Sequence, residues 1–191
     1  MELKGSKTEK FLAKAYAVES TAYTRYMFFA KTAKKEGYIF FSKIFEETAA
    51  NEMRHAKTFL KYLQDSAVIC EPIEVDSGIL SPTEANLLVA EHEEDIEGVQ
   101  TYQEAAKVAQ DEGFAEIAVR FRIIAGVESH HKERFALMRR QIAEGTVWKR
   151  DAAIKWLCME CGFIIESKEP PRKCPGCGKT YQYFMPQGEL L

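Results

Sequence analysis

The stretch Asn51-Glu52-Met53-Arg54-His55 decides the fold of this chain. Glu52 and His55 stand three positions apart, so on a helix they project from one face, one turn from each other. A carboxylate and an imidazole placed in this way can reach a single metal ion. The pattern returns once, in Glu128-Ser129-His130-His131. One Glu-x-x-His is common by chance, so two copies indicate a metal site only if further carboxylates reach the same level.

Such carboxylates precede both copies. Glu19 precedes Glu52 by about one helix-turn-helix length, and Glu91 precedes Glu128 by a similar distance. The chain therefore contains a repeated unit, Glu followed by Glu-x-x-His. Ferritin-like di-iron and di-manganese bundles take their ligands in this arrangement, one Glu from each of two helices and Glu-x-x-His from each of the other two. Any one of these residues could be an ordinary solvated helix residue. Six of them in two matching repeats favour a metal site, and this donor set favours iron or manganese over zinc.

Two further residues lie on the same helical faces. Glu94 follows Glu91 by three positions, so this helix offers the site a second carboxylate that could bind metal or carry protons. The alternative is a surface residue in the acidic run 91–97. Tyr26 follows Glu19 by seven positions, two turns along one stripe. Its phenol could hydrogen-bond a ligand carboxylate or donate a proton, and the alternative is an ordinary core tyrosine.

Apolar periodicity predicts four long helices, over about residues 2–36, 40–64, 81–112 and 114–144. Gly37, Gly113 and Gly145 are well placed to end the first, third and fourth of them. The third helix has a clear start signal, with Ser81 as N-cap, Pro82 at the first helical position, and Glu84 completing a capping box.

The lengths of the connections predict the topology. Helices one and two, and helices three and four, are joined by very short turns, so each pair forms an antiparallel hairpin. The middle connection, residues 65–80, can span roughly 50 Å at about 3.3 Å per residue. A helix of about 28 residues is roughly 42 Å long. The connection can therefore cross the full bundle, which predicts an all-α ferritin-like four-helix bundle with one long crossover.

Composition and charge limit the classes of partner and the location that we expect. The chain has 46% hydrophobic and 29% charged residues and a formal net charge of −3. Without a basic stripe, we expect no nucleic-acid partner. The first ten residues are polar and no apolar run approaches a membrane span, so we expect no signal peptide, no membrane insertion and a cytoplasmic location.

Four cysteines form two matching knuckles near the C-terminus, Cys158-Met159-Glu160-Cys161-Gly162 and Cys174-Pro175-Gly176-Cys177-Gly178. In a chain without a secretion signal this pattern indicates metal binding rather than disulfides. Four thiolates suit either zinc or a single iron. We predict a bundle over residues 1–147 and a small metal-stapled β/loop domain over residues 148–191, too short to fold on its core alone. Cys70 stands apart, and we assign it no role.

The whole chain resembles the rubrerythrins, in which a ferritin-like di-iron bundle precedes a rubredoxin-like domain. Carried over by position, the family's two-iron ligands fall on Glu19, Glu52, His55, Glu91, Glu94, Glu128 and His131. The ligands of its Fe(Cys)4 centre fall on Cys158, Cys161, Cys174 and Cys177. Two departures stand out. Many relatives carry a tyrosine eight residues after the first glutamate of helix three, where this chain has Val99. Many also have His-Pro after the last knuckle, where this chain has Lys179-Thr180.

The resemblance implies a peroxidase. Hydrogen peroxide would be reduced to water at the di-iron site, and electrons would return through the Fe(Cys)4 centre from an NADH-linked reductase or a rubredoxin. It also implies exchange of one iron between His55 and Glu94 with redox state, proton delivery or hydrogen bonding by Glu94 and Tyr26, and a homodimer or higher homo-oligomer. The alternative is a ferroxidase-type iron-binding protein whose tail is a structural zinc ribbon. Colour separates the two, because an oxidised Fe(Cys)4 centre is red and a zinc ribbon is colourless.

Overall fold

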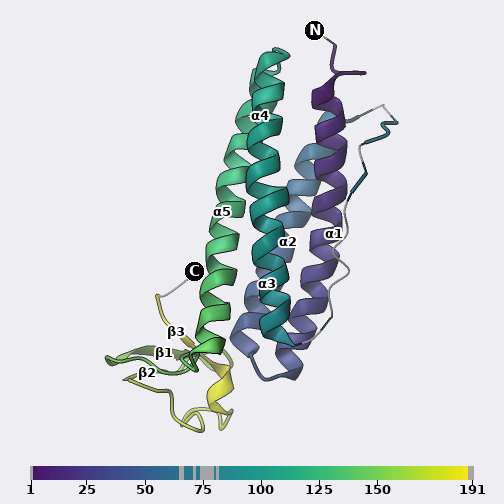
Figure 1. Ribbon diagram of the computed structural model, residues 1–191. Helices are drawn as coiled ribbons and strands as arrows, with labels where there is room; N and C mark the ends of the chain where they lie inside the picture. The colour runs from purple at the N-terminus through teal and green to yellow at the C-terminus, as the bar shows by residue number, and fades with distance from the viewer. Residues whose placement is uncertain (1, 65–66, 71, 74–79, 81, 189–191) are drawn as a thin grey trace.

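The computed structural model describes residues 2–64, 67–70, 72–73, 80 and 82–188. Over these residues, four long helical rods stand side by side, and a small three-stranded domain lies at one end of them (Figure 1). The second rod ends at the end of the bundle away from the small domain, and the third rod begins at the end beside that domain. Their connection therefore has to cover the length of the bundle. The predicted fold class, a ferritin-like bundle with one long crossover and a small C-terminal domain, is confirmed.

The first hairpin consists of α1 (Lys7–Lys35) and α2 (Ile39–Tyr62). The second consists of one composite rod and α5 (Ala115–Ala143). The composite rod runs without a break through α3 (Thr83–Glu93), the π-helix η1 (Glu94–Gln100) and α4 (Thr101–Asp111). Gly37 and Gly113 end the first rod of each hairpin with φ of 90° and 83°, a conformation that favours glycine.

Two helix starts differ from the prediction. The first helix begins at Lys7 rather than near residue 2, because Gly5 takes a positive φ and Ser6 then caps the helix by accepting the Glu9 N–H at 3.0 Å. The third rod begins at Thr83, with Pro82 as the N-cap and no side-chain cap.

Ser81 lies outside the described residues, and Pro82 takes the N-cap position that was predicted for Ser81. The Thr83 N–H donates to the Glu36 carboxylate at 2.9 Å, so the turn of the first hairpin supplies an acceptor for the third rod.

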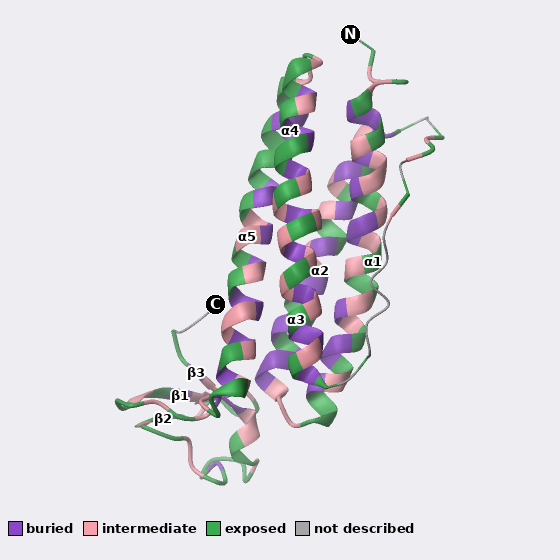
Figure 2. Cartoon of the chain, in the orientation of Figure 1, coloured by how far each residue is buried: buried purple, intermediate pink, exposed green. Residues whose placement is uncertain are grey.

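The core is divided into two apolar clusters with a polar layer between them. On α2, Phe45 and Phe59 each lie seven residues from Glu52, and on α5, Phe121 and Phe135 each lie seven residues from Glu128. Phe45 and Phe135 belong to the cluster nearer the small domain, and Phe59 and Phe121 to the cluster at the other end. Buried residues turn toward the middle of the bundle along its whole length (Figure 2). The carboxylates are therefore held in a slab closed by aromatic rings above and below.

The small domain is an antiparallel sheet of β1 (Ile154–Cys158), β2 (Ile164–Ser167) and β3 (Phe184–Pro186), in the order β2-β1-β3. A 3-10 turn, η2 (Tyr181–Tyr183), leads into β3. Its core is small and consists of Trp156, Phe184, Cys158 and Cys174. So few buried side chains agree with the expectation that a metal must hold this domain together.

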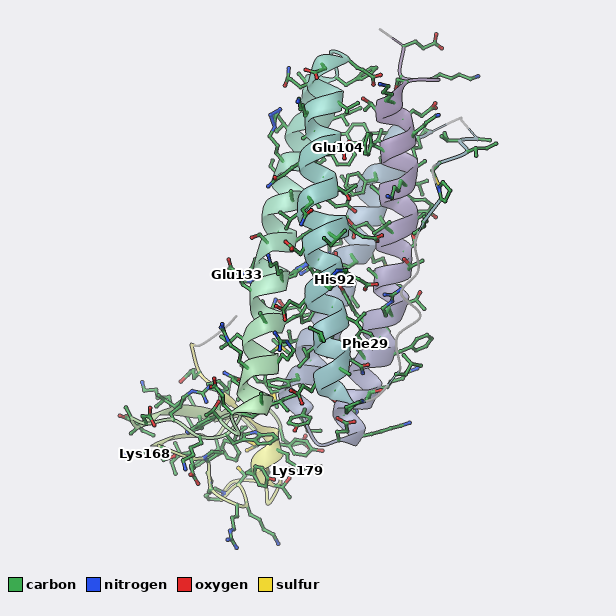
Figure 3. All side chains as sticks on the ribbon, viewed as in Figure 1. Phe29, His92, Glu104, Glu133, Lys168 and Lys179 are labelled. Atoms are coloured by element: carbon green, nitrogen blue, oxygen red, sulfur yellow. The ribbon has the colours of Figure 1, made fainter. Side chains whose placement is uncertain are left out.

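An aromatic stack joins the two parts of the chain. The Trp148 ring is parallel to the Tyr38 ring at a centroid distance of 5.7 Å, and Tyr181 meets Trp148 edge-on at 5.0 Å. A Cβ on Gly37 would overlap the Gln182 side-chain nitrogen, so the small domain approaches the α1–α2 turn closely. The boundary between residues 147 and 148 stays a prediction. Figure 3 labels Phe29 in the bundle and Lys179 in the small domain. The Lys179 Nζ lies 4.8 Å from the centre of the Tyr183 ring.

Candidate metal centres

The polar layer brings six of the predicted ligands together. Their donor atoms form two overlapping groups, each with all donors within 4.8 Å of one another. The first contains Glu19, Glu52, His55 and Glu128, and the second contains Glu52, Glu94, Glu128 and His131. Because Glu52 and Glu128 belong to both groups, the arrangement offers two adjacent ion positions with two shared carboxylates. The four carboxylates and His131 are at most 5% exposed.

Each histidine presents Nδ1 to several carboxylates at once. His55 Nδ1 lies 2.9 Å from Glu52 Oε2 and 3.0 Å from Glu128 Oε1. His131 Nδ1 lies 2.9 Å from Glu128 Oε2 and 3.1 Å from Glu52 Oε1. One nitrogen can donate only one proton, and Glu52 Oε1 and Glu128 Oε1 are buried without a hydrogen bond of good geometry. Buried carboxylate oxygens without donors are costly unless a cation satisfies them, so the donor set fits a pair of metal ions.

The pKa shifts of the cluster in the metal-free protein also agree with a metal site. Burial raises the pKa of Glu94 to about 8, with the charge of Glu52 adding to the effect. Burial and the charge of Glu128 raise the pKa of Glu19 well above its usual value. Burial also opposes ionisation of Glu128, but hydrogen bonds from His131 and His55 lower its pKa to about 2.

Burial acts on the pKa values of the histidines in the opposite direction. Burial would lower the pKa of His55, but hydrogen bonds to Glu128, Glu19 and Glu52 raise it to about 12. Hydrogen bonds to Glu128, Glu52 and Glu94 likewise raise the pKa of His131, against the effect of burial. Without metal the site therefore neutralises its own carboxylates with protons, and metal ions would have to displace them.

Two tyrosines bind the cluster in a symmetric way. The Tyr26 hydroxyl donates to Glu94 Oε1 at 2.6 Å, and the Tyr102 hydroxyl donates to Glu19 Oε1 at 2.6 Å. Each tyrosine thus joins the glutamate of the opposite hairpin, and each stands 11 positions before the glycine that ends its rod. The predicted hydrogen bond from Tyr26 to a cluster carboxylate is present, whereas Tyr102 was missed.

Glu91 does not lie in the cluster, which corrects the prediction that it converges with the other ligands. Its Oε2 accepts from Arg139 Nε at 2.9 Å, on the side of the rod that faces α5, and its side chain is 23% exposed. The first carboxylate that the third rod gives to the cluster is Glu94. Counted from Glu94, the residue eight positions on is Tyr102, so the apparent departure at Val99 came from counting one turn too early.

The sequence carried a signal for this correction. Glu52 follows Glu19 by 33 positions, and Glu128 follows Glu94 by 34 but Glu91 by 37. The single extra residue belongs to η1, because a π-helical turn accommodates one residue more than an α-helical turn. With Glu94 as the first carboxylate, the second one on the same face is Glu97. It lies beside the cluster and lines the cavity described next.

A cavity opens onto the cluster between α1 and the composite rod. Glu19, Glu52, Glu94, Glu128, Tyr26 and Tyr102 form its base. Thr21, Arg25, Glu93 and Glu97, which are exposed or half-buried, line its outer part together with neighbouring residues of α1. The volume is about 30 Å³, enough for one or two water molecules. A molecule of that size could therefore reach the carboxylates from outside.

Gly98 allows the helices at this level to approach closely. A Cβ at this position would lie 2.6 Å from both Cβ and Cγ of Glu128 and 3.6 Å from Glu94 Oε2. Glycine is thus required here by the neighbouring α5, and it lets Glu128 enter the cluster.

The second centre is formed by the two knuckles. All four cysteine sulfurs lie within 4.8 Å of one another, with Cys158 and Cys177 3.8 Å apart and Cys161 and Cys174 3.6 Å apart. Gly162 and Gly178 follow the second cysteine of each knuckle with φ of 77° and 75°, as the tight turns require. Burial alone would raise the pKa of Cys174, but the backbone N–H groups of Cys177 and Gly176 help to lower it to about 7. The four thiols fit a single tetrahedral metal ion.

Comparisons with known proteins agree with both centres. The family model described as Rubrerythrin matches residues 10–139, and the model described as Rubrerythrin, rubredoxin-like domain matches residues 156–185. Rubrerythrin-1 of Clostridium acetobutylicum is 42% identical over 186 residues, 95% of each chain. The rubrerythrin of Porphyromonas gingivalis is also 42% identical, over 96% of this chain and 92% of the relative. The rubrerythrin of Nitratidesulfovibrio vulgaris is 40% identical over 95% of each chain.

Solved structures show the same architecture. Nigerythrin in its fully reduced state matches with a TM-score of 0.63 and 27% identity, over 96% of this chain and 90% of that chain. The bacterioferritin of Desulfovibrio desulfuricans matches with a TM-score of 0.64 and 22% identity, over 72% of this chain, which shows the bundle fold alone. No described helix is long and apolar enough to cross a membrane. With a carboxylate–histidine di-iron site in the bundle and a four-cysteine site in the tail, the chain belongs to the rubrerythrin family.

Proposed function

We propose that the protein reduces hydrogen peroxide to water at the carboxylate–histidine cluster, with electrons supplied through the four-cysteine iron centre. The reaction consumes two electrons and two protons for each peroxide and yields two water molecules. Iron bound at the two overlapping positions would supply the electrons that cleave the O–O bond. The remaining requirements, which are ligation, access and protons, fall on the residues of this chain.

The observation that carries the proposal is the hydrogen-bonded pair of Tyr26 and Glu94 at the base of the cavity. Glu94 is a donor of the second ion position, and the Tyr26 hydroxyl is the proton-bearing partner of its carboxylate. The Tyr26 hydroxyl is 2.6 Å from Glu94 Oε1, and both residues line the space where a small oxidant would enter. A hydroxyl in this position can hydrogen-bond an oxygen atom of the oxidant or supply a proton to it as the O–O bond breaks.

We assign the metal positions from the two groups of donors. Glu19 and His55 would hold one ion, Glu94 and His131 the other, and Glu52 and Glu128 both. Glu97 lines the cavity next to this set, so it is a candidate for a further ligand when the charge of the site changes. This assignment removes Glu91 from the predicted ligand set, and Glu97 takes its place as the seventh candidate.

The four-cysteine centre is proposed as the electron relay. Its domain packs against the α1–α2 turn through the Tyr38–Trp148–Tyr181 stack, so it is held on the bundle and not on a loose tether. Reducing equivalents would come from an NADH-linked reductase or a small redox protein. A homodimer would let one chain's relay serve the cluster of the other. The free thiols of the two knuckles suit a reducing compartment, for which the cytoplasm is the proposed location.

Steady-state turnover with and without the relay tests this function. Iron-loaded protein, a suitable reductase and NADH are mixed with hydrogen peroxide, and NADH oxidation is followed for the native chain and for Cys161→Ser. The native chain should turn over, whereas Cys161→Ser should lose its red absorption and its turnover but keep the iron of the bundle. Undiminished turnover in a variant shown to lack the four-cysteine iron would exclude the relay.

A further inference from the structure

The ion pair between Arg25 and Glu93 lies across the outer part of the cavity. Arg25 comes from α1 and Glu93 from the last position of α3, so the pair joins the two walls between which the cavity opens. The side chains are 14% and 17% exposed, whereas Tyr26 and Glu94 beneath them are 1% and 5% exposed. The pair therefore marks the boundary between solvent and the cluster.

The pair is also tied to the base of the cavity by the chain itself. Arg25 directly precedes Tyr26, and Glu93 directly precedes Glu94. Tyr26 and Glu94 are hydrogen-bonded to each other at 2.6 Å. Two consecutive cross-links thus hold α1 and the composite rod at a fixed separation. One is the ion pair at the mouth, and the other is the hydrogen bond between phenol and carboxylate at the base. A cavity with walls fixed in this way cannot widen easily for a larger guest.

We propose that the Arg25–Glu93 ion pair is a size gate that restricts the cluster to oxidants as small as hydrogen peroxide. The inference rests on the proposed function, since the cavity is a substrate path only if peroxide reacts at the cluster. The space of about 30 Å³ accepts a molecule the size of one or two waters. An alkyl hydroperoxide, which would be reduced to an alcohol and water, carries a hydrocarbon group that this space does not admit. Arg25 and Glu93 are thus specificity-determining residues that need not contact the reacting atoms.

The chain supplies a matched control. Glu91 and Arg139 form a comparable ion pair on the same rod, also partly exposed, but it faces α5 and neither residue lines the cavity. Arg139→Ala removes an arginine from a carboxylate of α3 without changing the mouth. Any general effect of losing such a pair on packing or net charge should therefore appear in Arg139→Ala as well.

The first test compares hydrogen peroxide with tert-butyl hydroperoxide for the native chain, Arg25→Ala, Arg25→Ala/Glu93→Ala and Arg139→Ala. The double variant leaves no charge unpaired, so it serves if the single variant folds poorly. We expect the ratio of kcat/KM for the alkyl peroxide over hydrogen peroxide to rise about tenfold in both gate variants and to stay unchanged in Arg139→Ala. An unchanged ratio in gate variants that keep their fold and iron would overturn the gate.

A second test does not depend on peroxide chemistry. The oxidised, iron-loaded proteins are titrated with azide and with benzoate, and binding is followed by visible absorption. Both probes are singly charged anions, so loss of the arginine charge affects them alike, and the ratio of their affinities reports size. The gate predicts that benzoate gains about tenfold over azide in the two gate variants only. A ratio equal to that of the native chain contradicts it. If the native chain reduces no peroxide, the proposed function falls while this titration still decides the gate.

Discussion

The hydroxyl of Tyr26 donates a hydrogen bond to Glu94 Oε1 at 2.6 Å, so a phenol of the first hairpin is joined to a carboxylate of the second. Both residues are almost fully buried. We expect Tyr26→Phe to leave the fold and the iron content unchanged but to slow single-turnover peroxide reduction by about tenfold or more, since the cluster loses the hydroxyl that hydrogen-bonds Glu94 and can supply a proton. Stopped-flow absorption measures this rate.

Tyr23→Phe provides the control for that variant, because Tyr23 lies on the same helix and is 36% exposed. It should behave as the native chain does. Equal rates in the native chain and Tyr26→Phe would remove Tyr26 from the proton supply and leave it a core residue.

The corrected ligand set can be tested by iron content. Glu94→Ala removes a donor of the second ion position, so we expect the bundle to lose iron, whereas Glu91→Ala breaks only the ion pair with Arg139. A partly exposed ion pair contributes about 0–1 kcal/mol, so Glu91→Ala should fold and load normally. Iron per chain is measured after anaerobic reconstitution. Loss of iron in Glu91→Ala would return Glu91 to the ligand set, and full loading of Glu94→Ala would remove Glu94 from it.

Two helical glycines give a paired test of packing at the cluster. Gly98→Ala places a methyl group 2.6 Å from the Cβ and Cγ of Glu128, whereas a Cβ on Gly126 meets no atom within 4 Å. Gly126→Ala should therefore stabilise the protein by about 0.5–1 kcal/mol, since alanine is favoured over glycine in a helix. Gly98→Ala should lose about 1–3 kcal/mol and part of the bundle iron. Chemical denaturation measures the stability of both variants, and iron analysis measures their loading. Stabilisation by Gly98→Ala would contradict the close approach of Gly98 to Glu128.

The metal-free protein should become less stable as pH rises from about 5 to 9. The pKa of Glu94 is raised from 4.5 to about 8, so its stabilising contribution is complete below 4.5 and is lost as pH rises through 8. The pKa of His55 is raised from 6.5 to about 12, so its contribution is lost as pH rises from 6.5 toward 12. Glu128 acts in the opposite direction, but only below 4.5, because its pKa is lowered to about 2.

Thermal unfolding of the metal-free and iron-loaded forms over this range tests the prediction. Iron displaces the protons, so the loaded form should show a flatter profile, and binding should release about two or three protons per chain near pH 7. Calorimetry in buffers of different ionisation enthalpy measures that release. Metal uptake without proton release would mean that the histidines are already neutral and that Glu94 is already ionised.

Much of the site was predictable because helical spacing is rigid. Glu-x-x-His places its two donors on one face wherever the helix is regular, and Glu52, His55, Glu128 and His131 all lie where that rule puts them. The cysteine knuckles were predictable for the same reason, since Gly162 and Gly178 take the positive φ that the turns demand.

The third rod was misread because it is not a regular helix. Residues 94–100 form a π-helix, which inserts one residue and shifts the face that meets the cluster. Glu91, Glu94 and Glu97 are all spaced by three, so spacing alone could not choose between the two overlapping pairs. Distance from the interhelical glycines does choose, because Glu19 stands 18 positions before Gly37, and Glu94 stands 19 positions before Gly113 but Glu91 stands 22. The extent of the Arg25–Glu93 contact depends on how two rods pack, which no local pattern encodes.

The most direct test of the account is a single turnover followed by rapid freezing and Mössbauer spectroscopy. Fully reduced, iron-loaded protein is mixed anaerobically with one equivalent of hydrogen peroxide per chain. The account predicts that the two irons of the bundle are oxidised first, two electrons per peroxide, and that the four-cysteine iron is oxidised only afterwards as it re-reduces them. Oxidation of the four-cysteine iron before the bundle irons, or bundle irons that stay ferrous while peroxide persists, would contradict it.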